Sequence, residues 1–260
     1  MTISNGPKRG SDVLAYTVTY GDRPFLGRVV AGMRGSAGMW FDWLVCAGAP
    51  SDALAADCKK LLHAPDASGV QYLQLWEENR GQHHATNAAM KLARERGYKW
   101  LLRIDDDVEF KTKRWLKRIL KRNDELKRLI NADLEKADKI KNIFVYVPTV
   151  LRLKVPVKHV GVMEKGQSYD VEIVPYASGC LRLLPMDLMK DYIAPIYAPC
   201  GRGDPQSIAD YVTDHGGLQL RFRDIRVIHD TVEIEKADTP HGAIQREMSH
   251  YWPFLEAKDV

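Results

Sequence analysis

Three consecutive aspartates, Asp105, Asp106 and Asp107, follow an apolar run and are the part of this sequence best suited to chemistry. Adjacent like charges repel, and each loses hydration if the end of the strand is enclosed, so the cluster favours a counter-cation. Carboxylate oxygens suit Mg²⁺ and Mn²⁺, and such ions commonly bridge a protein carboxylate to a substrate phosphate. The alternative interpretation is a solvated acidic turn, because turns are rich in aspartate.

The elements before the aspartates alternate between strand and helix. Strands are expected over 13–20, 40–46, 69–75 and 99–104, and helices over 25–34, 53–62 and 82–96. Such alternation predicts an α/β fold with a mostly parallel central sheet flanked by helices. Ligands of such sheets bind beyond the carboxyl ends of the strands, which is where the aspartates fall.

The second half of the chain has a less regular pattern. Its expected elements are a highly charged helical segment over 111–141, a strand over 143–147, a hairpin within 151–174, a strand over 176–184, helices over 186–192 and 204–214, and one or two strands over 218–228. No internal repeat or low-complexity linker divides the sequence, so a single domain over residues 1–260 is expected.

The composition is that of an ordinary globular protein, with 260 residues, 45% hydrophobic residues and a formal net charge of +4. The four cysteines are dispersed without a Cys-x-x-Cys pair, which argues against a zinc site and fits buried thiols in a reducing compartment. Residues 1–10 lack the apolar core of a signal peptide, and no stretch approaches the ~18 apolar residues of a membrane span. We therefore expect a cytoplasmic protein with no transmembrane segment, located in the host cell if a phage encodes it.

A second motif joins the third expected strand to its helix. Asn79, Gly81, Ala85 and Asn87 have the spacing Asn-x-Gly-x-x-x-Ala-x-Asn, and the aspartates follow one helix and one strand later. In this order the two motifs resemble those of family-2-type glycosyltransferases with the GT-A fold, and the resemblance extends loosely from Val13 to about Asp230. A glycine lets the backbone approach a ligand closely, and a helix start favours negative charge. An ordinary loop and helix cap would also explain Asn79 and Gly81, and Asn87 would then satisfy a neighbouring loop.

The resemblance implies a site for a nucleotide-diphosphate sugar, with an uncertain nucleotide. Tyr20 can line the base or pack in the core, and only Asp52 resembles the acidic residues that the family often has after the second strand. Uridine is the usual nucleotide of the family. The implied donor-binding residues are Thr17, Thr19, Tyr20, Asn79, Arg80, Gly81, Asp105 and Asp106.

The same resemblance implies a divalent cation, Mn²⁺ or Mg²⁺, held by Asp105, Asp107 and His229. His229 ends the last expected strand, where several enzymes of this fold supply a metal ligand. A lone histidine after a strand is otherwise usually structural. The aspartate cluster favours the metal-binding role.

The acceptor side is implied by two short segments. Ser178 and Gly179 resemble the small-residue strand near the family's acceptor site, where small side chains allow close approach to the backbone. Asp204 occupies the position of the family's catalytic base, although Gly203 replaces the glutamate that many members carry before it. Asp204 before Pro205 is also a good helix N-cap, and the two roles are compatible. Asp210 is the reserve candidate for the base.

The expected function is therefore a metal-dependent, inverting glycosyl transfer to an acceptor hydroxyl. The expected organisation is a nucleotide-sugar-binding half over about 11–110, a charged helical insertion over 111–142, an acceptor and catalytic half over 143–235, and a tail over 236–260. The basic run over 111–128 is usually a solvated face, but contact with anionic lipids or nucleic acid is also open.

Three alternatives remain. One is a phage-type glycosyltransferase acting on modified bases in DNA, and another is a non-catalytic nucleic-acid-binding module. The third is a nucleotidyltransferase, which would usually carry a Gly-rich basic loop after the first strand; residues 20–24 match that loop poorly.

Overall fold

A computed structural model of the protein describes residues 10–21, 32, 35–62, 69–132, 144–150, 158–164, 167–174, 180–195 and 204–229. Its strands are β1 (Val13–Tyr20), β2 (Asp42–Gly48), β3 (Gln71–Trp76), β4 (Trp100–Ile104), β5 (Val108–Phe110), β6 (Phe144–Val150), β7 (Lys158–Glu164), β8 (Gln167–Ile173), β9 (Leu181–Pro185) and β10 (Leu218–His229). Its helices are α2 (Asp52–Leu62), α3 (Gly81–Arg96), α4 (Trp115–Ala132), α6 (Met186–Met189) and α7 (Asp204–Asp214).

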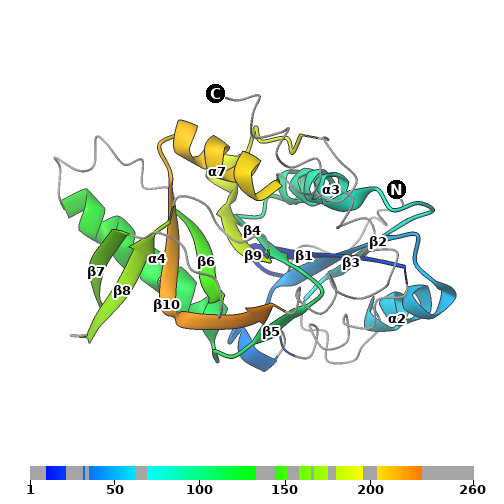
Figure 1. Ribbon diagram of the computed structural model, residues 1–260, viewed down its shortest axis with the longest axis horizontal. Helices are drawn as coiled ribbons and strands as arrows, with labels where there is room; N and C mark the ends of the chain where they lie inside the picture. The colour runs from blue at the N-terminus through cyan, green and yellow to red at the C-terminus, as the bar shows by residue number, and fades with distance from the viewer. Residues whose placement is uncertain are drawn as a thin grey trace, which may run out of the picture.

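The strands form one sheet in the order β3-β2-β1-β4-β9-β6-β10-β8-β7, with β5 paired to β10 (Figure 1). The first four strands are mutually parallel, and β9 adds to them antiparallel. The remaining strands are mixed: β6 and β10 are parallel, whereas β7 and β8 form an antiparallel hairpin. The predicted α/β class, with a parallel first half and a mixed second half, is confirmed.

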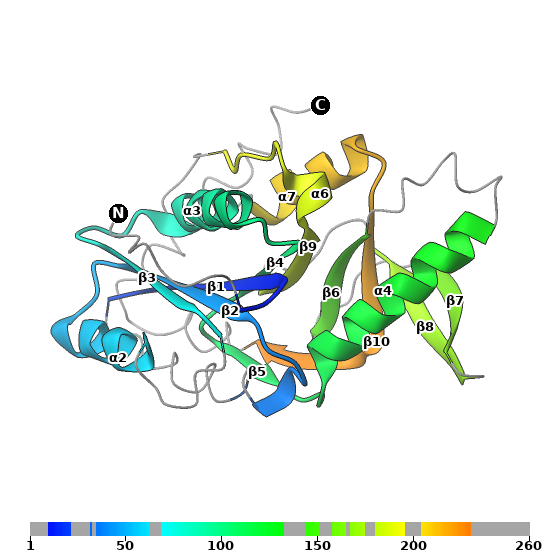
Figure 2. The ribbon, with the colours of Figure 1, turned by 180° about the vertical axis from the view of Figure 1, so that it is seen from behind.

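Apolar side chains alternate along the strands and bury on both faces of the sheet. On one face Ala15 and Leu102 belong to a core cluster that includes residues of α2 and α4. On the other face Leu14 and Leu101 pack with residues of α3, α6 and α7. The period-two alternation of a strand therefore divides the helices between the two faces of the sheet, and Figures 1 and 2 show α3 and α7 above the strands β1 to β3 and α2 below them.

Helix α4 is part of this core, because Trp115, Leu116, Ile119 and Leu126 are buried in the first cluster. Seen from behind in Figure 2, it crosses in front of β6 and β10. The helix that was expected within 111–141 therefore starts at Trp115, and its apolar stripe faces the sheet. Residues 133–143 lie outside the described residues.

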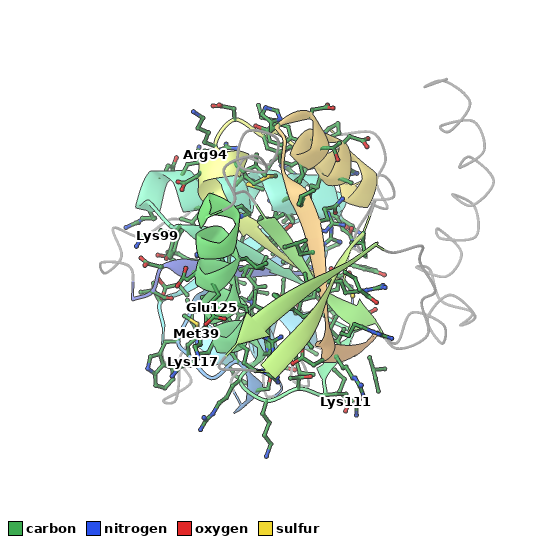
Figure 3. The ribbon with its side chains drawn as sticks, turned by 90° about the vertical axis from the view of Figure 1, so that its left-hand side faces the viewer. Met39, Arg94, Lys99, Lys111, Lys117 and Glu125 are labelled. Carbon is green, nitrogen blue, oxygen red and sulfur yellow. The ribbon has the colours of Figure 1, made fainter. Side chains whose placement is uncertain are left out.

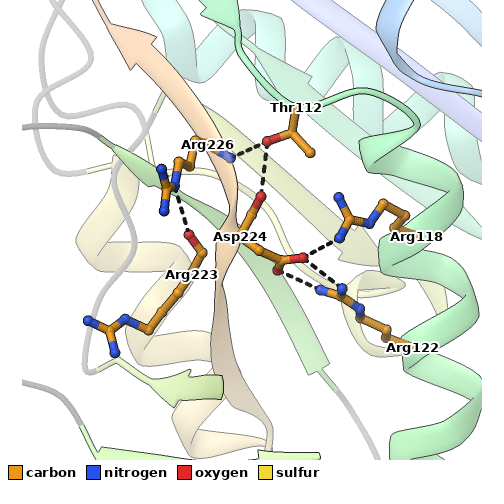
Figure 4. Close-up of polar contacts among 6 residues, drawn as sticks. All are labelled: Thr112, Arg118, Arg122, Arg223, Asp224 and Arg226. Atoms are coloured by element: carbon orange, nitrogen blue, oxygen red, sulfur yellow. Dashed lines mark hydrogen bonds and ion pairs between the residues drawn. The ribbon is translucent and has the colours of Figure 1, made fainter. Parts of the chain in front are cut away.

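A β-bulge in β10 fixes α4 to the sheet through a charged contact. The register between β10 and β6 shifts between Phe222 and Arg226, and Asp224 lies within the shift. Both oxygens of the Asp224 carboxylate accept hydrogen bonds from Arg122, at 2.7 and 2.7 Å, and Arg118 donates to the same group (Figure 4). The Arg122 guanidinium is fully buried and lies 4.8 Å from the centre of the Phe222 ring. Bidentate, charge-assisted bonds of this kind are among the strongest polar contacts.

We expect Arg122→Met to lower the free energy of unfolding by roughly 2 kcal/mol, between the cost of breaking a buried and an exposed pair, because Asp224 is 36% exposed. Burial opposes ionisation of Asp224, but the bonds and charges of Arg122 and Arg118 outweigh it and lower the pKa. The pair therefore stabilises above the unfolded pKa of about 3.9 and loses its effect as pH falls through the folded value. Urea unfolding should show a smaller Arg122→Met effect at pH 3 than at pH 7, and equal effects would contradict this.

Most expected elements appear close to their predicted bounds. The strand over 13–20 and the helix over 204–214 have the predicted ends, and the helix over 82–96 begins one residue earlier and stops at Gly97, where φ is 68°. The hairpin within 151–174 is β7 and β8. Strand β5 was not predicted, because three residues are too few for a periodic pattern. The helix expected over 25–34 falls largely outside the described residues.

The described cysteines, Cys46, Cys58 and Cys180, are buried free thiols, as expected. Burial raises the pKa of Cys46, and burial followed by the charge of Asp57 raises the pKa of Cys58 to about 11. The thiols of Cys46 and Cys58 are therefore held in the unreactive protonated form at neutral pH. Among the described residues, no helix is both long and apolar enough to cross a membrane.

Candidate functional site

The carboxyl ends of the four parallel strands meet at one edge of the sheet. There the Gly21 amide donates to Gly48 O at 3.2 Å, and the Ala49 amide donates to Trp76 O at 3.0 Å. Gly48 touches the next loop so closely that a Cβ atom there would lie 2.9 Å from Asn79 Cα. Only glycine fits this approach, so the end of β2 fixes where the Asn79 loop lies.

The Asn79 loop forms a tight turn into α3. Asn79 Oδ1 accepts a hydrogen bond from the Gly81 amide at 3.0 Å, and Gly81 has a φ of +74°, which favours glycine. Arg80 forms an ion pair with Glu78 at 3.3 Å, and both side chains are exposed. The Asn79 side chain thus closes the turn that leads into α3, a local structural role that was one of its two interpretations, and the exposed Arg80 side chain lies at the predicted donor edge.

The aspartate cluster is largely enclosed rather than a solvated turn. Asp106 and Asp107 are only 2% and 4% exposed. The side chain of Asp105 is 14% exposed, and its Oδ1 accepts from Arg103 Nε at 3.1 Å. The Asp105 amide also donates to Cys180 O at 2.9 Å, which ties the cluster to the start of β9.

Strand β5 brings the end of β10 beside the aspartates. Its antiparallel register pairs Val108 with His229 and Phe110 with Val227. Paired residues of this kind have Cα atoms roughly 5 Å apart, so the His229 backbone lies next to the residue that follows Asp107. The structure describes the backbone of His229 at this position, and its side chain lies outside the description. Asp107, in the turn directly before β5, and His229, at the end of β10, are thus brought next to each other although they are more than 120 positions apart in the sequence.

The chemistry of these donors fits Mn²⁺ or Mg²⁺. Enclosed carboxylates at consecutive positions need cations nearby, and Arg103 supplies one for Asp105. Among the described side chains no three of His, Cys, Asp or Glu gather as a metal-binding group. Mg²⁺ commonly binds through one or two carboxylates together with substrate phosphates, so a larger protein cage is not required.

The predicted residues of β1 have different surroundings. Thr17 is fully buried, and its hydroxyl accepts a hydrogen bond from Trp43 Nε1 at 3.1 Å. Its side chain therefore joins β1 to β2 within the core. Thr19 is also fully buried, and among the described residues its hydroxyl has no hydrogen-bond partner. Tyr20 is partly buried at the carboxyl end of β1. Thr19 and Tyr20 therefore remain the better placed of the three for a ligand.

Beyond β2, Ser51 caps α2 by accepting from the Leu54 amide at 3.2 Å. Asp52 follows as the exposed first residue of this helix. Ser51 is therefore the capping side chain of this helix. Asp52 is thus exposed next to Ser51, whose amide donates to Gly21 O after β1 at 2.7 Å.

Helix α7 carries Asp204 as its first residue and is held by a chain of polar contacts. The Asn87 side chain on α3 donates to Ala194 O at 3.0 Å and accepts from its amide at 2.7 Å. Tyr192, two residues earlier, shares a hydrogen bond of 2.7 Å with Ser207 on α7. Asn87 therefore satisfies a neighbouring loop, as one interpretation predicted, and that loop anchors the helix that begins at Asp204.

The structure leaves some predicted acceptor-side residues undescribed. Ser178 and Gly179 lie outside the described residues, although Cys180 directly after them contacts Asp105. Asp204 is described by its backbone. Asp210, the reserve candidate, is exposed six residues further along α7.

Two side chains near the aspartates were missed by the sequence analysis. Arg103 is buried beneath the cluster, and one of its terminal nitrogens donates to Gln82 Oε1 at 2.5 Å. The available signal was a charged residue inside the otherwise apolar run Trp-Leu-Leu-Arg-Ile, because arginine in a buried strand requires a partner. Gln82 carried no comparable signal.

The basic side chains that the structure describes between 111 and 126 form two groups. Arg118 and Arg122 bind Asp224 and so serve the fold. Lys111, Lys113, Arg114, Lys117 and Lys121 are exposed, and Figure 3 shows Lys117 projecting near Met39 with Lys111 along the same lower edge. Contact with nucleic acid through this surface stays a prediction, and it involves fewer charges than the sequence suggested.

Residues 15–192 match the family described as Glycosyl transferase family 2. Among solved structures, a mannosyltransferase from Pyrobaculum calidifontis in complex with GDP-Man and Mn²⁺ has a TM-score of 0.58 at 14% identity, over 84% of this chain and 56% of that one. TarS of S. aureus has a TM-score of 0.59 at 14% identity, over 92% of this chain and 42% of that one. GalNAc-T7 with UDP, GalNAc and Mn²⁺ has a TM-score of 0.52 at 11% identity, over 84% of this chain and 43% of that one. No curated protein sequence matches.

The chain thus spans about half the length of these structures, which share its fold. The match to the family covers more than half of the chain, from β1 to the segment after α6. It includes both motifs of the candidate site, the Asn79–Asn87 turn and helix and the aspartates after β4. The protein therefore belongs to glycosyl transferase family 2, and it has the GT-A fold of these structures.

Proposed function

We propose that the protein transfers a sugar from a nucleotide-diphosphate sugar to an acceptor hydroxyl, with inversion at the anomeric carbon and dependence on Mn²⁺ or Mg²⁺. The observation that carries this is the pairing of His229 with Val108, which places a histidine position beside the enclosed Asp107 at the carboxyl edge of the parallel strands. The P. calidifontis mannosyltransferase, which shares this fold, was crystallised with a nucleotide sugar and Mn²⁺.

The donor would bind across the ends of β1 to β4. Thr19, Tyr20 and the Asn79–Gly81 turn would contact the nucleoside, and Asp105 and Asp106 the ribose. Asp107 and His229 would hold the cation, with Asp105 as a further candidate ligand. When bound, the cation neutralises charge on the diphosphate. Uridine is the proposed nucleoside, because it is the usual one in this family.

The acceptor would approach from the side of Ser178, Gly179 and α7. The Asp204 carboxylate would take the proton of the acceptor hydroxyl while that oxygen forms a bond to the anomeric carbon. The bond from the anomeric carbon to the diphosphate oxygen breaks at the same time, and the nucleoside diphosphate leaves with the electron pair. Attack opposite to the leaving group inverts the configuration.

The expected result of a thermal-shift screen is stabilisation by one class of nucleotide sugar in the presence of Mn²⁺ or Mg²⁺. A ligand at a hundred times its Kd stabilises by about 2.7 kcal/mol, which corresponds to a rise in Tm of roughly 5–10 °C for a chain of this size. UDP- and GDP-sugars should be compared with nucleoside triphosphates, each with and without metal. A response to triphosphates alone would favour the nucleotidyltransferase alternative, and no response to any nucleotide would contradict the proposal.

Hydrolysis of the donor in the absence of acceptor separates an enzyme from a binding module. We expect slow, metal-dependent release of the nucleoside diphosphate, because water can take the place of the acceptor hydroxyl. Anomer analysis of the released sugar by NMR reports inversion. Acceptance of glycosylated or modified DNA as the acceptor would identify the phage-type alternative.

A further inference from the structure

Arg103 lies beneath the aspartate cluster and connects two segments of the proposed donor site. It is 2% exposed, and its strand position places it on the face of the sheet that α3 covers, together with Leu101. Its Nε donates to Asp105 Oδ1 at 3.1 Å, and a terminal nitrogen donates to Gln82 Oε1 at 2.5 Å. Gln82 is the second residue of α3, directly after Gly81. One guanidinium therefore bonds the aspartates after β4 to the helix start after β3.

This contact joins the two segments of the edge by hydrogen bonds within the protein itself. Asp105 is held through its backbone by Cys180 O and through its side chain by Arg103. The guanidinium is planar and always charged, so its nitrogens address two acceptors in a fixed relation. A lysine has a single charged nitrogen and a flexible stem, and at this depth it cannot hold both acceptors in the same geometry.

Burial excludes a direct contact between Arg103 and a donor at the edge. The neighbouring strand also carries a fully buried arginine, Arg182, which is the cross-strand partner of Arg103 on the same face. Buried like charges side by side are costly unless anionic groups hold them. The Asp105 carboxylate therefore offsets the buried positive charge of Arg103, just as Arg103 offsets the negative charge of Asp105.

We propose that Arg103 is a positioning residue for the donor, which sets the Asp105 carboxylate and the first turn of α3 in one arrangement that receives the nucleotide. This inference rests on the proposed function. Through the ribose contact proposed for Asp105 it assigns to Arg103 a role in donor affinity and none in the chemical step, because the bridge lies on the donor side and Asp204 begins a different helix.

The test compares Arg103→Lys with Arg122→Lys as a matched control. Both arginines are buried and bound to an aspartate. Arg122, however, joins α4 to Asp224 of β10, which is not one of the residues proposed to bind the donor. The Kd of UDP and of GDP, each with Mn²⁺, is measured by calorimetry for folded protein. Arg103→Lys should raise the Kd of the preferred nucleotide roughly tenfold, the effect of weakening one charged hydrogen bond. Arg122→Lys should lower Tm and leave the Kd within about twofold.

Kinetics supply a second readout that a merely structural role would not produce. With Arg103→Lys, KM for the donor should rise with the Kd while kcat stays within about threefold, which is the pattern of lost uniform binding. A structural defect would lower kcat through the folded fraction and leave KM unchanged. Equal Kd values for the two lysine variants would overturn the inference.

Gln82→Ala keeps the inference testable if Arg103→Lys fails to fold. Gln82 is partly buried on the first turn of α3, so its truncation removes one end of the bridge without leaving a buried cavity. The Kd should rise by severalfold, and an unchanged Kd would overturn the inference. If the wild-type protein binds neither UDP nor GDP, the proposed function fails first, and the inference fails with it.

Discussion

Replacement of Asp107 by alanine is expected to reduce sugar transfer by roughly 10³-fold or more, because neutralisation of the leaving diphosphate contributes several kcal/mol. The gain in nucleotide affinity that Mn²⁺ produces should disappear in the same variant. The fold should remain intact, since removal of one carboxylate from a cluster of three relieves repulsion. Calorimetric titration of UDP with and without Mn²⁺, together with a thermal melt, measures all three effects.

Glu109→Ala is the matched control for this variant. Glu109 lies two residues after Asp107, is about 40% exposed and pairs with Lys111, so its removal changes the net charge equally. Transfer and metal-dependent affinity should both stay near the wild-type values, since exposed pairs contribute little. If Asp107→Ala keeps its metal-dependent affinity, Asp107 does not bind the cation, and the proposal for this residue is wrong.

Replacement of Asp204 by asparagine is expected to lower transfer by roughly 10²-fold or more while donor affinity stays near normal. Asparagine retains a side-chain oxygen that can serve the cap predicted for Asp204, so the stability should change little. Asp204→Ala should lose the base and the cap together, with about 1 kcal/mol of additional destabilisation. Steady-state kinetics and urea unfolding of the two variants separate the catalytic role from the structural one.

Asp210→Asn provides the comparison on the same helix. Asp210 is exposed on α7, six residues after Asp204, and should tolerate the change with nearly full activity. If Asp204→Asn transfers sugar at the wild-type rate and Asp210→Asn does not, Asp204 is only a cap and Asp210 is the base. If both variants retain full activity, neither carboxylate removes the acceptor proton.

The first half of the fold could be predicted from the sequence because its signals are local. The run from Val13 to Tyr20 alternates between the two faces of one strand, and its predicted ends were confirmed. Gly97 follows the periodic pattern of α3 and adopts the left-handed conformation that ends a helix. Each signal spans about one element, so neighbouring residues are sufficient to specify it.

The motif from Asn79 to Asn87 could be located but only partly interpreted. Its spacing indicated the connection between β3 and α3, and the Gly81 conformation and the hydrogen bond from the Gly81 amide to Asn79 follow from local geometry. The partner of Asn87 is Ala194, 107 positions later. Nothing near Asn87 in the sequence specifies that contact, although the possibility of a neighbouring loop was open.

The basic run shows why a charge pattern alone misleads. Lys117 and Arg122 look equivalent in the sequence, yet Lys117 is exposed and Arg122 is completely buried. The difference depends on a bulge in β10 that places Asp224 against α4, 102 positions away. The charge pattern of one helix cannot reveal that a distant strand will supply an acidic partner for one of its arginines.

The sequence by itself determined the α/β class, the two motifs and the position of the aspartates at a strand end. Only the tertiary structure decided that β5 pairs with β10, which brings His229 beside Asp107, and that Arg103 bonds Asp105 to Gln82. The physical reason is the range of the forces involved. Periodic burial and helix capping act between residues a few positions apart, whereas pairing of distant strands and satisfaction of buried charges depend on how the whole sheet packs.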